Sequence, residues 1–353
     1  LAEMAELATK LDTQHGYDLV VVRGLAIAKA LLGRENVLRK CWLYLTDIPQ
    51  CPTAVDQQLR KYLREMAHRC HRVLCQTPSF RDLWRTLVPD LPAEKLLVYQ
   101  PVVDHPPEAP RPINERPRIA LYAGKFKAEW HTLEMARVWS RVQRAHRDAR
   151  LWMIGDKIHN DPMHPEFSRQ MRDALEHTKN LEWLGAMSRE SVLARMADAR
   201  VGLSWRCESM DSSLELSTKV LEYGAAGCAA ILNRNPLHEA LLGKDYPLFA
   251  NNEKQFAGAL KLALTDDEVT QHSADALMEL AEEHSFSHRV KRVTEWLAEL
   301  PGRSSEASAS QRKLRVLIAG HDLKFFTGIQ RKLEESGEFE FIIDKWQGHN
   351  KHD

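Results

Sequence analysis

The residues best suited to chemistry form one short run, Ser217-Thr-Lys-Val-Leu-Glu222, which Gly227 follows closely. Ser217 or Thr218 is expected to cap a helix that passes through Lys219 and Glu222 and ends at Gly227. A helix start presents unpaired backbone N–H groups and the positive end of the dipole, which suit a diphosphate. Lys219 adds a cation, and the Glu222 carboxylate, one turn further, can accept two hydrogen bonds from a ribose diol. The alternative is a surface helix with an ordinary Glu and Lys pair.

Strand and helix patterns alternate on both sides of this run. The second half has apolar runs at 118–123, 150–154, 181–184, 200–204 and 228–232, and helical patterns at 256–264, 269–283 and 288–300. The first third has apolar runs at 18–23, 41–46, 71–76 and 95–100, and Thr77-Pro78-Ser79 is a typical helix start. This alternation predicts an α/β protein with doubly wound parallel sheets.

Prolines between Pro101 and Pro117 separate the two sets of strands, and they predict a linker because they interrupt helices and central strands. We expect an N-terminal Rossmann-like domain at 1–112, which lacks its first strand and glycine-rich loop. A second Rossmann-like domain with closing helices is expected at 113–300. A small-residue linker follows at 301–312.

The tail at 313–353 has a strand pattern at 314–321, a helix at 327–336 and a strand at 339–344. These elements predict either the beginning of a further Rossmann-like domain or strands that complete the N-terminal sheet, and we favour the first alternative. The chain also starts without Met, in the middle of an amphipathic pattern at 1–11. We therefore expect a piece of a longer, tandem polypeptide.

Composition excludes several classes of protein. Lys plus Arg and Asp plus Glu both number 49, so no net charge recruits nucleic acid or an anionic membrane. No apolar run is long enough to span a bilayer. The six cysteines form no Cys-x-x-Cys pair and predict reduced thiols in the cytoplasm. His159, His164, Asp156 and Asp161 lie in a proline-containing loop, and we expect no metal site there.

Several blocks, in order, resemble the retaining GT-B glycosyltransferases. The run "STKVLEYGAAGCAAIL" is similar to the second half of their Glu-x7-Glu signature. "ALYAGKF" at 120–126 is similar to the strand and glycine loop that open the donor domain, and "LWMIGD" at 151–156 to its second strand. "LEWLGAMSRESVLARMADARVGLSWR" at 181–206 is similar to the loop, helix and strand that follow. The resemblance covers about 18–300 and implies two Rossmann-like domains.

The resemblance also implies roles for single residues. Glu222 matches the glutamate that holds the nucleotide ribose, and Ser217, Thr218 and Lys219 match the turn that meets the donor diphosphate. Lys125 matches the basic residue after the loop glycine, Gly124, where the missing side chain lets the backbone approach the phosphates. The loop that includes Gly185, Ala186 and Met187 matches the one beside the base.

The chain departs from the family pattern at two positions. Leu214 stands where the signature has its first glutamate, and Glu215 and Glu208 are the nearby acids considered in its place. Trp130 stands where the family has a second phosphate-binding lysine, and Lys127 is considered as its substitute. Both departures affect the contacts to the sugar more than those to the nucleotide.

The resemblance implies transfer of a sugar from a nucleotide diphosphate sugar to a glycan or other hydroxyl acceptor, with retention at the anomeric carbon. No metal or other cofactor is expected. Lys125 and the helix amides are expected to stabilise the leaving diphosphate. Two alternatives stay open: a non-catalytic nucleotide-sugar-binding module of a tandem protein, and a sugar-nucleotide epimerase of the same fold. Glycine-rich dinucleotide and Walker-type motifs are absent, which disfavours dehydrogenases and ATPases.

Overall fold

The protein divides into two compact units. The computed structural model describes residues 2–104, 109–300, 314–320, 335 and 341–346. Unit 1 consists of Leu1–Pro101, Leu214–Leu216 and Phe286–Asp353, and unit 2 of Val102–Ser213 and Ser217–Ser285. The chain passes from one unit to the other after residues 101 and 285, which lie 11 and 15 residues before the expected boundaries at 112 and 300. The predicted linker at 301–312 lies outside the described residues.

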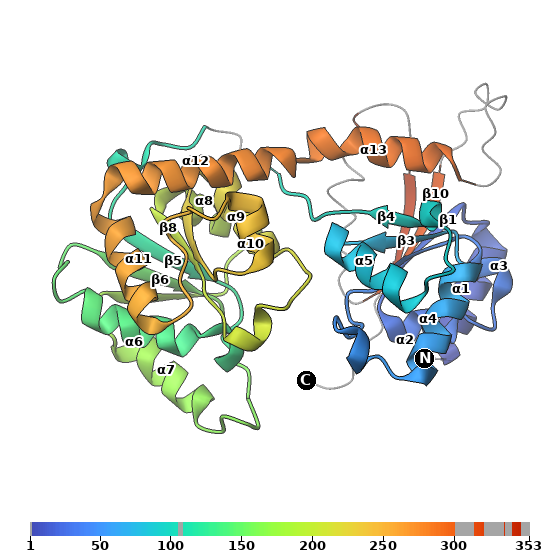
Figure 1. Cartoon of the computed structure of the whole chain (residues 1–353), viewed down its shortest axis with the longest axis horizontal. Helices are drawn as coiled ribbons and strands as arrows, with labels where there is room; N and C mark the ends of the chain where they lie inside the picture. The colour runs from blue at the N-terminus through green and yellow to red at the C-terminus, as the bar shows by residue number, and fades with distance from the viewer. Residues whose placement is uncertain (1, 105–108, 301–313, 321–334, 336–340, 347–353) are drawn as a thin grey trace. The chain divides into compact units, whose positions relative to one another are not determined.

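Unit 1 contains a six-stranded parallel sheet with the strand order β11-β10-β1-β2-β3-β4 (Figure 1). Its strands are β1 (Leu19–Arg23), β2 (Cys41–Tyr44), β3 (Arg72–Cys75), β4 (Leu96–Val98), β10 (Leu314–Gly320) and β11 (Phe341–Trp346). Its helices are α1 (Ala2–His15), α2 (Leu25–Ala30), α3 (Glu35–Leu38), α4 (Gln57–Arg69), α5 (Pro78–Leu87) and α13 (Phe286–Ala298), with short 3-10 turns η1 (Pro52–Ala54) and η2 (Ala93–Lys95).

The tail strands belong to this sheet, contrary to the alternative we favoured from the sequence. β10 pairs with β1 in parallel, with Leu19 opposite Val316 and Arg23 opposite Gly320. The tail therefore completes the N-terminal sheet instead of starting a sheet of its own. The physical reason is that β1 otherwise leaves a row of backbone groups unpaired at an edge. The helix expected at 327–336 lies almost entirely outside the described residues.

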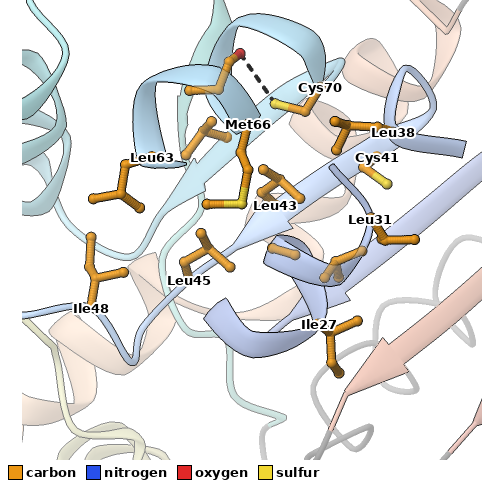
Figure 2. Close-up of a cluster of buried hydrophobic side chains, with 14 of the residues drawn as sticks. Ile27, Leu31, Leu38, Cys41, Leu43, Leu45, Ile48, Leu63, Met66 and Cys70 are labelled. Atoms are coloured by element: carbon orange, nitrogen blue, oxygen red, sulfur yellow. Dashed lines mark hydrogen bonds between the residues drawn. The ribbon is translucent and has the colours of Figure 1, made fainter. Parts of the chain in front are cut away.

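The core of unit 1 packs helices α2 and α4 on the buried face of β1 and β2. Figure 2 shows this cluster, in which Leu31, Leu43 and Met66 are fully buried. A local signal starts α5 as expected. The Thr77 side chain accepts a hydrogen bond from Phe80 N at 3.1 Å and caps α5.

Unit 2 contains a five-stranded parallel sheet with the order β7-β6-β5-β8-β9. Its strands are β5 (Ile119–Ala123), β6 (Arg150–Ile154), β7 (Leu181–Gly185), β8 (Val201–Ser204) and β9 (Ala229–Leu232). The order reverses beside β5, since the chain builds β6 and β7 on one side of it and β8 and β9 on the other. The carboxyl edge at such a reversal is where ligands bind in open α/β sheets.

The helices α6 to α9 alternate with these strands in sequence, and α10 to α12 follow the last strand. They are α6 (Thr132–Val142), α7 (Phe167–His177), α8 (Arg189–Asp198), α9 (Thr218–Ala225), α10 (Pro236–Leu242), α11 (Glu253–Thr265) and α12 (Asp267–Glu283), with 3-10 turns η3 (Ile113–Glu115), η4 (Ala128–Trp130) and η5 (Glu208–Met210). The buried aromatic side chains of Trp139, Tyr223 and Phe256 fill the core beside the sheet. The predicted fold class, two parallel α/β sheets in a Rossmann-like arrangement, is confirmed.

Candidate functional site

A pocket of about 320 Å³ opens in unit 2 where β5 and β6 end. Two glycine loops and two helices form its wall. The lining residues are Ala123, Gly124, Lys125, Ile154, Gly155, Asp156, Lys157, Ala186, Met187, Val192, Met196 and Glu222. The pocket therefore lies at the sheet edge that the strand order marks for a ligand.

The two glycines in this wall are required by backbone geometry. Gly124 has φ +150° and Gly155 has φ +142°, both in the region that side chains rarely adopt. A Cβ built on Gly155 would collide with the carbonyl oxygen of Gly124. The two loops consequently pass each other backbone to backbone, which leaves the backbone of the pocket wall open to a ligand.

Helix α9 begins at the predicted place, with Ser217 in the N-cap position, but its cap differs from the expectation. No side chain caps the first turn. The Ser217 hydroxyl instead accepts a hydrogen bond from Arg206 Nη2 at 3.2 Å. Because α9 has no side-chain cap, its first N–H groups are left for another acceptor.

The Lys219 ammonium, in the first turn of α9, lies against aromatic rings. Its Nζ is 4.1 Å from the ring centroid of Tyr122 and 5.5 Å from that of Trp130. Burial lowers the pKa of Lys219 to about 7; the nearby Arg206 charge lowers it further, while Glu222 acts in the opposite direction. The group is thus a cation that gives up its proton near neutral pH.

The Glu222 carboxylate lines the pocket and is not part of the hydrophobic core. Its side chain is 24% exposed, and Arg189 Nη2 lies 3.4 Å from Oε1. Burial raises the pKa of Glu222, and the charges of Arg189 and Lys219 lower it in part. The structure therefore brings Lys219 and Glu222 together on one helix, as the sequence predicts.

The other predicted nucleotide contacts are only partly gathered at the pocket. Lys125 is exposed and lines it, and its carbonyl accepts a hydrogen bond from the Tyr122 hydroxyl at 2.5 Å. Ala186 and Met187 also line it, whereas Gly185, with φ +64°, ends β7 just before them. Lys127 is outside the lining and pairs with Glu129 at 3.1 Å. Thr218 is exposed and outside it too.

The two candidate acids are not among the residues that line the pocket. Glu215 belongs to unit 1, where its Oε1 accepts a hydrogen bond from Gln50 Nε2 at 2.7 Å. Leu214, at the position of the family's first glutamate, packs on the hydrophobic core of unit 1. Glu208 is exposed in η5 and does not line the pocket. Within unit 2, Glu208 is thus separate from the pocket that Glu222 lines.

Four residues of this neighbourhood were missed by the sequence reasoning: Tyr122, Trp130, Arg189 and Arg206. Arg206 follows the end of β8 by two residues and so lies at the carboxyl edge of the sheet. Because ligands bind at this edge, its position in the sequence could have marked it as a site residue. Trp130 was noted only as the loss of a lysine. Three cations surround its ring. Measured to the ring centroid, Lys127 Nζ lies at 5.2 Å, Lys219 Nζ at 5.5 Å and Arg206 Cζ at 5.8 Å.

Two features of the described residues bear on other kinds of site. Among them, no three His, Cys, Asp or Glu side chains are grouped to hold a metal ion. In that same part of the chain, no helix has both the length and the apolar character needed to cross a membrane.

Comparison with protein families matches residues 137–295 to the model described as "Glycosyl transferase-like". The chain resembles the GT-B glycosyltransferases. This match begins inside α6 and includes α9 with Lys219 and Glu222. The predicted resemblance and the prediction of a glycosyltransferase are therefore supported. A comparison with curated proteins finds no match.

Several solved structures have the same fold. HepE of Anabaena, in complex with UDP and glucose, has a TM-score of 0.63 at 12% identity and covers 84% of this chain and 81% of its own. Trehalose-6-phosphate synthase of E. coli, bound with UDP-2-fluoro glucose, has a TM-score of 0.63 at 14% identity, with 84% and 77% covered. A UDP-forming α,α-trehalose-phosphate synthase of Burkholderia xenovorans has a TM-score of 0.63 at 13% identity, with 84% and 77% covered.

Proposed function

We propose that this chain transfers a sugar from a nucleotide diphosphate sugar to a glycan or other hydroxyl acceptor, with retention and without a required metal. The observation that carries the proposal is the pocket of unit 2. The pocket is lined by two glycine loops, by Lys125 and by Glu222. Glu222 lies in the early part of α9, a helix whose N-cap residue makes no side-chain cap. This is the combination of groups that a nucleoside diphosphate needs.

The pocket residues suggest how the donor lies. The apolar side chains of Met187, Val192 and Met196 suit a base, and the Glu222 carboxylate suits the two hydroxyls of a ribose. Gly124 and Lys125 then face the diphosphate, together with the amides at the start of α9. Since HepE and the synthase of E. coli were solved with uridine nucleotides, UDP is the first nucleotide to test.

The chemistry follows from where charge develops. When the bond between the anomeric carbon and the diphosphate oxygen breaks, that oxygen takes the bonding electron pair, and the acceptor hydroxyl forms the new bond and passes its proton to the departing diphosphate. Lys125, Lys219 and the helix amides would stabilise the leaving diphosphate. Removing one such preorganised charge costs about 10²–10³ in rate in other enzymes.

The experiment is a titration of the full chain with UDP, GDP, ADP and CDP, followed by assays of donor hydrolysis and transfer with the matching sugar nucleotides. Glu222→Ala and Lys125→Ala are measured beside the wild type. Binding and turnover that both variants impair would support the proposal. Unchanged binding and turnover in both would refute the assignment of the pocket.

A non-catalytic nucleotide-sugar-binding module is the second candidate, favoured by Leu214 and Trp130 at two positions where the family has charged side chains. Binding of a nucleotide sugar without hydrolysis or transfer would support it. Conversion of one nucleotide sugar into its epimer would instead indicate the third alternative.

A further inference from the structure

The Lys219 ammonium contacts two aromatic rings that come from different parts of unit 2. Tyr122 lies in β5, is 1% exposed and donates its hydroxyl proton to the Lys125 carbonyl. Trp130 ends η4 and is half-buried. Because one ring is fixed by the sheet and the other by the turn before α6, the ammonium meets a surface that is formed without a ligand.

This surface adjoins the pocket wall at Gly124. A Cβ built on Gly124 would lie 3.0 Å from Lys219 Nζ and 3.2 Å from the Tyr122 hydroxyl oxygen. The ammonium is therefore next to a backbone segment that lines the pocket, although Lys219 is itself not part of the lining. A glycine at this position leaves the space that the ammonium uses.

The charged groups near the ammonium oppose one another. The Arg206 guanidinium, from the segment after β8, lies 5.8 Å from the Trp130 ring centroid and repels the ammonium. Glu222 attracts it from the same helix. A lysine side chain loses rotamer entropy when it is held in one place. The attraction of a cation to a ring face offsets part of that loss.

We propose that Tyr122 and Trp130 are positioning residues, which hold the Lys219 ammonium beside Gly124 so that it meets the donor diphosphate. The contact between Lys219 and the donor diphosphate rests on the proposed function, whereas the positioning of Lys219 by the two rings does not. The rings act through Lys219, so their effect on donor binding must disappear when Lys219 is removed.

The first test is a double-mutant cycle for UDP binding, measured by calorimetry at pH 6, where Lys219 is protonated. Tyr122→Leu is expected to weaken UDP binding about 3- to 30-fold in the wild type and less than about 2-fold in Lys219→Met. Trp130→Leu is expected to behave in the same way. Tyr122→Phe keeps the ring and should retain most of the affinity. An equal loss on both backgrounds would overturn the proposal, since the rings would then act only through packing.

A matched control separates positioning from general destabilisation. Tyr246 is also a buried tyrosine of unit 2 and donates its hydroxyl to the Ala230 carbonyl at 2.7 Å, whereas the ring that Lys219 contacts most closely is that of Tyr122. Tyr246→Leu should lower the melting temperature about as much as Tyr122→Leu and leave UDP affinity unchanged. If it weakens UDP binding as much as Tyr122→Leu does, the ring of Tyr122 has no special role.

The second test needs no ligand, so its result does not depend on whether the proposed function is correct. In protein labelled with ¹³C-lysine, the Lys219 Cε resonance is identified by its absence from Lys219→Met. Ring currents should displace its attached protons upfield, and Tyr122→Leu or Trp130→Leu should return them toward the ordinary lysine position. Unchanged protons in both variants would overturn the positioning. A positive result in a protein that binds none of UDP, GDP, ADP and CDP would sustain the positioning and refute the proposed function.

Discussion

The Arg189 guanidinium, in the first turn of α8, lies 3.4 Å from the Glu222 carboxylate on α9. Burial raises the pKa of Glu222, and Arg189 is the first of two cations that lower it again. Arg189 therefore helps to keep a half-buried carboxylate ionised beside the pocket. An ionised carboxylate is the form that accepts two hydrogen bonds from a diol.

Glu222→Ala is predicted to weaken UDP binding about 10- to 100-fold, because hydrogen bonds to a charged group contribute about 1.5–3 kcal/mol. The same change should not alter the binding of 2′-deoxy-UDP nearly as much, since that ligand lacks one of the two hydroxyls. Calorimetric titration of both ligands against the wild type and Glu222→Ala measures the coupling between the Glu222 carboxylate and the 2′-hydroxyl of the ribose.

Glu190→Ala serves as the control, because Glu190 is an exposed acid in the first turn of α8, outside the pocket lining. It should leave both affinities unchanged. If Glu222→Ala weakens UDP and 2′-deoxy-UDP by the same factor, Glu222 does not hold the ribose.

Lys219 makes donor binding pH-dependent. The pKa of Lys219 is about 7 in the free protein, so the ammonium is present below pH 7 and is lost as the pH rises above it. The affinity for UDP-glucose is therefore predicted to be highest below pH 7 and to fall by up to about tenfold per pH unit above it, until the pKa of the complex is reached. Titrations at half-unit steps from pH 5.5 to 9 measure this.

Lys219→Met should bind UDP-glucose weakly at every pH and without this slope. Lys157→Met is the matched control, since Lys157 is an exposed lysine that lines the same pocket. It should keep the slope of the wild type. A slope that persists in Lys219→Met would assign the titration to another group.

The sequence predicts the part of the site that is local in the chain. Ser217, Lys219 and Glu222 are neighbours on one short helix, so their spacing alone places them together. Tyr122, Trp130 and Arg206 reach Lys219 from three other segments, and no local pattern links those segments. Glu215 shows the converse, because it is two residues from Ser217 in sequence and yet belongs to unit 1.

Gly155→Ala is predicted to destabilise unit 2 by at least about 2 kcal/mol, since a Cβ there is strained at φ +142° and collides with the Gly124 carbonyl. UDP binding should be lost with it, because the two loops form the pocket wall. Gly258→Ala is the control: Gly258 lies exposed in α11 with nothing within 4 Å of a Cβ, and the change should stabilise by about 0.5–1 kcal/mol. Denaturant unfolding measures both, and equal stability of the two variants would contradict the requirement for glycine at 155.

The strand pairing of the tail could not be predicted from the sequence. The apolar run at 314–320 suits any parallel sheet, and about 290 residues separate it from its partner β1. Whether such a strand completes an existing sheet or starts a new one depends on which edge is unpaired in space. The fold class follows from local alternation, whereas this pairing does not.

Leu317→Ala is predicted to destabilise unit 1 by about 2–5 kcal/mol, because Leu317 is 1% exposed in β10 and belongs to the core cluster that includes Val20 and Leu43. Hydrogen exchange should accelerate in peptides that contain β1 and β2. Peptides that contain β5 and β6, in the core of the other unit, should keep their protection. Arg315→Ala, two residues earlier on the same strand and with a half-buried side chain, should change little. If Leu317→Ala left β1 as protected as in the wild type, β10 would not stabilise the N-terminal sheet, and its pairing with β1 would have to be abandoned.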